Sequence, residues 1–138
     1  MVDVETVRAR LRILDRNFRR LVPYLDMPLH DFLASEDAQD IVEHNLRLAV
    51  QACIDIAAHV LADGGFRVPN TYKELFSEMA RAGWVQGDLA SRLGGAAGFR
   101  NVLVHEYAAL DLGKVYDHLQ HLDDLRAFAA AVLTRLDA

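Results

Sequence analysis

Residues 42–61 read VEHNLRLAVQACIDIAAHVL, and this stretch decides the fold. Its apolar residues recur at spacings of three and four, which predicts a helix with a broad apolar face. That face comprises Val42, Leu46, Ala49, Val50, Cys53, Ile56, Ala57, Val60 and Leu61. Because several of these side chains are small, a neighbouring helix can approach closely. We expect one long helix from Ser35 or Asp37 to Asp63, ended by Gly64 and Gly65.

The segments on either side also have helical periodicity. We expect helices over about 3–25 and 111–136, a short helical piece at 29–33, and further helices over about 71–83 and 88–109. Asp3, Thr71 and Asp88 are the expected N-caps, and Glu74 completes a capping box with Thr71. No segment has the period-two alternation of a strand. The prediction is therefore a single all-α domain, residues 1–138, built as a bundle of four long helices plus short helical pieces.

Composition restricts the setting of the protein. No uninterrupted apolar run approaches the ~18 residues of a transmembrane helix, so no membrane association is expected. The acidic N-terminus lacks the apolar region of a signal peptide. The single cysteine, Cys53, cannot form an internal disulfide. A reducing cytoplasmic setting is the expectation.

Charge is distributed unevenly along the chain. Residues 1–20 contain six arginines and three carboxylates, a net charge of +3. Since the whole chain carries −5, the remainder carries −8. The overall charge argues against broad nucleic-acid affinity, but one basic helix can hold an anionic ligand locally. A solvated helix face is the plainer interpretation of these arginines.

Residues 94–107, GGAAGFRNVLVHEY, place Arg100, Asn101, His105 and Tyr107 within eight residues. On a regular helix Arg100 and Tyr107 share a face, whereas Arg100 and His105 lie roughly 140° apart. The preceding glycines would permit a kink or a close approach to another backbone. An arginine that holds a phosphate, beside a histidine that moves a proton, suits RNA cleavage by attack of the ribose 2′-hydroxyl without a metal. Taken singly, such a histidine is more often structural and such an arginine a surface residue.

Two other polar features have less specific interpretations. Asp55, between Ile54 and Ile56, is expected to be partly buried with a partner. His118 and His121 have the spacing of two metal ligands on a helix, but no third ligand stands at an evident spacing. A solvated face is the favoured interpretation of these histidines, and no metal or cofactor is expected.

The pattern of Arg100, four residues, and then His105-Glu106-Tyr107 resembles the motif of HEPN-domain ribonuclease toxins of the HepT type. Three further runs resemble landmarks of the same family: residues 51–59, 69–72 and 98–101. The resemblance covers about residues 38–130, most of the chain. It implies a HEPN-type helical bundle with metal-independent ribonuclease activity on RNA, tRNA being the family-level guess.

The resemblance also implies roles for single residues. The active site would be composite, at the interface of a homodimer, with Arg100 and His105 as the catalytic pair. Asn101 would support them, and Asp55 would hold Arg100 in place. Tyr107 would be the tyrosine to which an MntA-type nucleotidyltransferase antitoxin transfers AMP. Two alternatives stay open: a non-catalytic binding module for a nucleotidyltransferase or a nucleotide, and a purely structural helical dimer.

Overall fold

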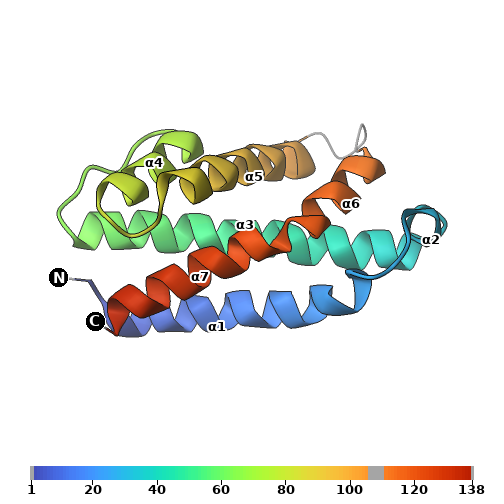
Figure 1. The fold of residues 1–138 in the computed structure, drawn as a ribbon, viewed down its shortest axis with the longest axis horizontal. Coiled ribbons are helices and arrows are strands. Elements are labelled where there is room, and N and C mark those ends of the chain that lie inside the picture. Colours follow the sequence, from blue (N-terminus) through green and yellow to red (C-terminus); the bar gives the residue numbers. More distant parts are fainter. Residues whose placement is uncertain (1, 106–110, 138) are drawn as a thin grey trace.

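The computed structural model describes residues 2–105 and 111–137, and the side chains of 2–101 and 111–137. Every regular element in these ranges is helical (Figure 1). The elements are α1 (Val4–Leu21), the 3-10 helix η1 (Val22–Tyr24), α2 (Leu29–Leu33), α3 (Glu36–Asp63), α4 (Tyr72–Arg81), α5 (Gly87–His105), α6 (Leu112–Gln120) and α7 (Leu122–Leu136). The predicted all-α bundle of four long helices, α1, α3, α5 and α7, is confirmed.

Helix α3 is the centre of the bundle. It packs against α1 on one side and against α4 and α5 on the other, while α7 crosses in front of it (Figure 1). All nine residues of its predicted apolar face are buried. By length and composition alone α3 could cross a membrane, but 61% of the qualifying window is buried inside the bundle. Packing in the core therefore accounts for its apolar character.

Two of the three predicted N-cap residues, Asp3 and Thr71, cap helices in the structure. The Asp3 carboxylate accepts a hydrogen bond from the Thr6 amide at 3.2 Å, and its hydrogen bonds to Thr6 lower its pKa. The Thr71 hydroxyl accepts one from the Glu74 amide at 3.2 Å. The prediction for Asp88 is wrong, because α5 begins at Gly87 and Asp88 lies within its first turn.

The expected helix over 111–136 is two helices, which is the main correction to the predicted fold. The break falls at His121, where φ is −101° and ψ is 20°. The backbone N–H of His121 bonds to the His118 carbonyl, three residues back, at 3.1 Å. The His121 ring nitrogen Nδ1 contacts the Asp117 carbonyl at 2.8 Å, the oxygen that a continuous α-helix would give to the backbone. This local competition was not visible in the apolar periodicity.

Helix α5 runs without interruption through Gly94, Gly95 and Gly98, so these three glycines mark no break. The other prediction for these glycines, a close approach to another backbone, is confirmed for one of them. A Cβ atom placed on Gly94 would lie 3.4 Å from the Cα of Lys73 in α4. Nothing in the described part of the chain lies within 4 Å of the corresponding position at Gly95 or Gly98. The backbones of α4 and α5 therefore approach closely at Gly94, while the other two glycines face open space.

Candidate functional site

Arg100 and Asn101 lie near the C-terminal end of α5 and contact each other. The Arg100 Nη1 atom donates a hydrogen bond to Asn101 Oδ1 at 3.3 Å. The Nε atom of Arg100 is buried and has no hydrogen-bond partner among the described residues. Arg100 as a whole is half-buried, whereas Asn101 is exposed. The guanidinium is thus oriented by its neighbour and retains donors for a further acceptor.

His105 ends α5, and its backbone belongs to the same continuous helix as Arg100. Five residues on a regular helix separate the two backbone positions by about 7.5 Å along the axis and roughly 140° around it. The side chain of His105 and the whole of Tyr107 lie outside the residues that the structure describes.

A polar groove adjoins Asn101. Its volume is about 480 Å³, and it runs between α5 and the start of α4. Its lining residues are Asn70, Thr71, Tyr72, Lys73, Gly94, Gly98 and Asn101. The groove thus joins residues from 69–72 with residues from 98–101, two of the runs that carry the family resemblance. Tertiary packing brings these distant segments together.

The groove is suited to an anion. Lys73 supplies a positive charge, and the N-terminus of α4 adds the favourable end of a helix dipole. Sequence reasoning missed Lys73 as a site residue. A signal for it was present, since the capping box placed Lys73 in the first turn of a helix. What was missing was the position of that helix against α5.

Asp55 has a different partner from the one expected. Its carboxylate lies 3.6 Å from Arg10 Nη1 of α1 and accepts a hydrogen bond from Gln51 Nε2 at 2.8 Å. Neither of these partners is Arg100, so the role of Asp55 in holding that arginine in place stays a prediction. The partial burial expected for Asp55 is confirmed. Asp55 therefore links α3 to α1 and does not line the groove described above.

His118 contacts the helix of the site through an aromatic stack. Its ring lies 3.9 Å from that of Phe99, the residue before Arg100, with an angle of 7° between the planes. Burial lowers the pKa of His118, so the neutral ring is favoured. This half-buried stack differs from the solvated face that we expected. Within residues 2–101 and 111–137, no group of three or more His, Cys, Asp or Glu side chains is arranged to hold a metal.

Comparison of the sequence with known proteins identifies the family. The profile of the ribonuclease HepT-like family matches residues 14–132. A tRNA nuclease HepT of Aphanizomenon flos-aquae is 33% identical over 118 residues, which cover 84% of this chain and 80% of that protein. An mRNA nuclease HepT of Shewanella oneidensis is 34% identical over 91 residues, 65% of this chain and 68% of that protein. The chain belongs to the ribonuclease HepT-like family.

Solved structures agree with this assignment. A tri-AMPylated Shewanella oneidensis HEPN toxin in complex with its MNT antitoxin matches with a TM-score of 0.83 and 27% identity, over 97% of this chain and 99% of that one. A toxin–antitoxin complex with AMP-PNP matches with a TM-score of 0.81 and 26% identity, over 96% and 99% of the two chains. The predicted HEPN-type architecture is confirmed.

Proposed function

We propose that this protein is the toxin of a toxin–antitoxin pair, a cytoplasmic endoribonuclease that cleaves RNA, with tRNA as a candidate substrate, without a metal ion. Membership of the ribonuclease HepT-like family carries the proposal. The site adds support, because Asn101, which accepts a hydrogen bond from Arg100, lines a groove that holds Lys73 and the N-terminus of α4. Both features suit a phosphate.

In the proposed reaction, His105 takes the proton from a ribose 2′-hydroxyl. The 2′-oxygen then attacks the adjacent phosphorus, a new P–O bond forms, and the bond to the 5′-oxygen of the next nucleotide breaks. That leaving oxygen needs a proton, and His105, protonated in the first step, supplies it. Arg100 stabilises the charge that develops on the non-bridging phosphate oxygens. Asn101 supports this by holding the guanidinium through the 3.3 Å hydrogen bond.

We further propose that the site is composite and forms in a homodimer. Positions 100 and 105 of one chain differ by roughly 140° about the axis of α5, so a single reacting phosphate is better placed between two copies of the helix. The open space over Gly95 and Gly98 leaves part of α5 accessible to a second subunit.

Tyr107 is the proposed target of the antitoxin, a nucleotidyltransferase that transfers AMP from ATP to the phenol oxygen with release of pyrophosphate. The added phosphate would place negative charge and bulk close to Arg100. It would thereby occupy the guanidinium and repel RNA. A mass measurement on protein co-expressed with an MntA-type nucleotidyltransferase tests this: we expect AMP adducts on Tyr107, and adducts confined to other residues would refute the assignment.

The catalytic proposal is tested by digestion of RNA with purified protein in EDTA. We expect wild-type protein to cleave, and both Arg100→Ala and His105→Ala to lose at least a hundredfold in rate. Arg67→Ala removes an exposed arginine outside the proposed site and is the control, with an expected change of less than twofold. Cleavage by the two site variants at the wild-type rate would refute the catalytic pair. No cleavage by wild-type protein, with retained binding of the nucleotidyltransferase, would favour the non-catalytic binding module instead.

A further inference from the structure

Helix α1 carries six arginines, and they fall into two groups. Arg8, Arg10 and Arg19 each form an ion pair, with Asp137, Asp55 and Asp15 respectively. Arg12, Arg16 and Arg20 are exposed and have no hydrogen bond or ion pair with any residue in the described part of the chain. We call these three residues the arginine stripe.

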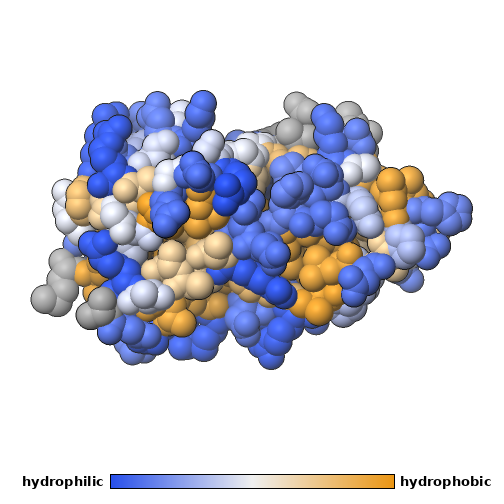
Figure 2. Space-filling view, in the orientation of Figure 1, coloured by the Kyte–Doolittle hydropathy of each residue, from blue (hydrophilic) through white to orange (hydrophobic). Residues whose placement is uncertain are grey.

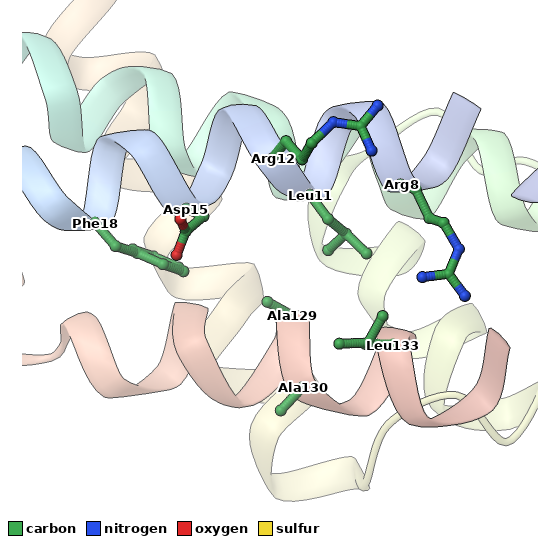
Figure 3. Close-up of a pocket in the computed structure, with 8 residues that line it drawn as sticks. All are labelled: Arg8, Leu11, Arg12, Asp15, Phe18, Ala129, Ala130 and Leu133. Atoms are coloured by element: carbon green, nitrogen blue, oxygen red, sulfur yellow. The ribbon is translucent and has the colours of Figure 1, made fainter. Parts of the chain in front are cut away.

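The arginine stripe is regular. Its members are four residues apart, so they follow one face of α1 at intervals of about 6 Å and span about 12 Å. That face is opposite to the one formed by Leu14, Phe18 and Leu21, which are buried. Arg12 also borders the groove between α1 and α7, but its side chain points away from α7, whereas Arg8 points toward it (Figure 3). The stripe therefore faces outward from the bundle.

Like charges four residues apart destabilise a helix, and no carboxylate among the described residues forms an ion pair with these three arginines. Residues outside the first twenty carry a net charge of −8, so these arginines stand on an otherwise acidic chain. A concentration of unpaired arginine on an acidic protein is the electrostatic pattern of a surface that binds an external polyanion.

The stripe suits a phosphate backbone better than a protein. Over about 12 Å, one strand of a nucleic-acid duplex presents three to four phosphates at ~3.4 Å per nucleotide. Protein interfaces are centred on buried apolar or aromatic anchors. Between Arg12 and Arg20 the only large apolar side chain that is exposed is Ile13. The chemistry along this face is thus dominated by guanidinium groups.

We propose that the arginine stripe is a second RNA-binding surface, which holds substrate phosphates at a distance from the site of cleavage. This inference rests on the proposed ribonuclease function. In Figure 1, α1 and α5 lie on opposite sides of α3. Two successive helix packings separate their axes by about 20 Å, which corresponds to about six nucleotides along one strand of a duplex at ~3.4 Å each. The stripe therefore selects long or folded RNA and has no effect on short oligonucleotides.

The first test measures binding of a tRNA transcript at several salt concentrations. The Arg100→Ala background prevents cleavage during the measurement. When R12Q/R16Q/R20Q is added, we expect roughly tenfold weaker binding at low salt. We also expect the slope of log K against log[salt] to be shallower by about 2, because each of the three lost phosphate contacts lowers its magnitude by ~0.7 on a single strand. The control R67Q/R81Q/K114Q removes the same charge from exposed positions elsewhere and should leave most of the affinity.

The second test compares substrates of different length in the otherwise wild-type protein. We expect the triple stripe variant to raise KM for tRNA with little change in kcat, and to cleave a tetranucleotide within twofold of wild type. If the slope of log K against log[salt] for tRNA is the same with and without the stripe substitutions, the stripe does not bind RNA, whatever the activity of the variant. Failure of the wild-type protein to cleave either RNA would instead refute the proposed function. The binding assay would still show whether the arginine stripe binds RNA. Loss of binding to the nucleotidyltransferase with RNA binding intact would assign the stripe to that protein and also refute our proposal.

Discussion

The close approach of α4 and α5 at Gly94 gives a quantitative prediction. At this position a Cβ atom would lie 3.4, 3.6 and 3.7 Å from the Cα, Cγ and Cβ atoms of Lys73. These are ordinary van der Waals contacts, so alanine has room. Any larger side chain would extend into the backbone of α4. Gly95, the next residue of the same helix, has nothing within 4 Å among the described residues and is the matched control.

The magnitudes follow from helix propensity and packing. Replacing glycine by alanine inside a helix is worth about 0.8–1 kcal/mol, so Gly94→Ala and Gly95→Ala should both stabilise the protein by about that amount. Gly94→Leu gains a similar propensity but loses about 1–3 kcal/mol to overpacking. Gly95→Leu has the gain without the clash. We therefore expect the two leucine variants to differ by about 2 kcal/mol, with Gly94→Leu the less stable.

Urea unfolding, monitored by circular dichroism, measures these differences. Because the proposed homodimer would make stability depend on concentration, all variants are compared at one protein concentration. An unchanged m-value would show that the variants change stability and not the extent of unfolding. Equal stability of Gly94→Leu and Gly95→Leu would refute the close contact between α4 and α5.

Three further predictions concern the core, the aromatic stack and the carboxylate of Asp55. Phe128 is fully buried and meets Phe76 edge to face at 5.8 Å, so Phe128→Ala should lose about 3–5 kcal/mol in the same urea assay. Burial lowers the pKa of His118 below 6.5 in the folded protein. The unfolded chain therefore binds a proton at this residue more readily than the folded protein does. The stability that is present above pH 6.5 should fall as the pH drops through the folded-state pKa. A His118→Gln variant should show a weaker loss of Tm between pH 7.5 and 5.5, and an identical loss would contradict the assignment. Asp55→Asn should change stability by less than about 1 kcal/mol, because its ion pair with Arg10 is substantially exposed. RNA cleavage by this variant within twofold of wild type would refute the role that the resemblance implies for Asp55.

The helices were predictable because local chemistry specifies them. Apolar periodicity identified α3, and the side chains of Asp3 and Thr71 accept the hydrogen bonds that start α1 and α4. The break at His121 was not predictable from that pattern, since the apolar stripe continues across it. It depends on a competing contact between the histidine ring and a backbone carbonyl. Such competition leaves no mark on hydrophobic spacing.

The site was predictable only in part, for a different physical reason. The motif indicated Arg100 and Asn101, which are adjacent in sequence, and the structure brings them into contact. Lys73 and the partner of Asp55 depend on which helices pack together, and sequence spacing within one helix carries no information about that. Asp55 was assigned to Arg100 by resemblance, whereas the packing of α1 on α3 gives it Arg10.

The same packing connects the fold to the chemistry that we propose. Gly94 lets α4 approach α5, and this approach forms the groove in which Lys73 faces the same space as Asn101. A leucine at Gly94 should therefore move the N-terminus of α4 and weaken phosphate binding, so KM for RNA should rise several-fold. Gly94→Ala should leave KM unchanged while it raises stability. If Gly94→Leu loses stability but keeps the wild-type KM, the groove takes no part in holding RNA, and Arg100 must act on the substrate without Lys73.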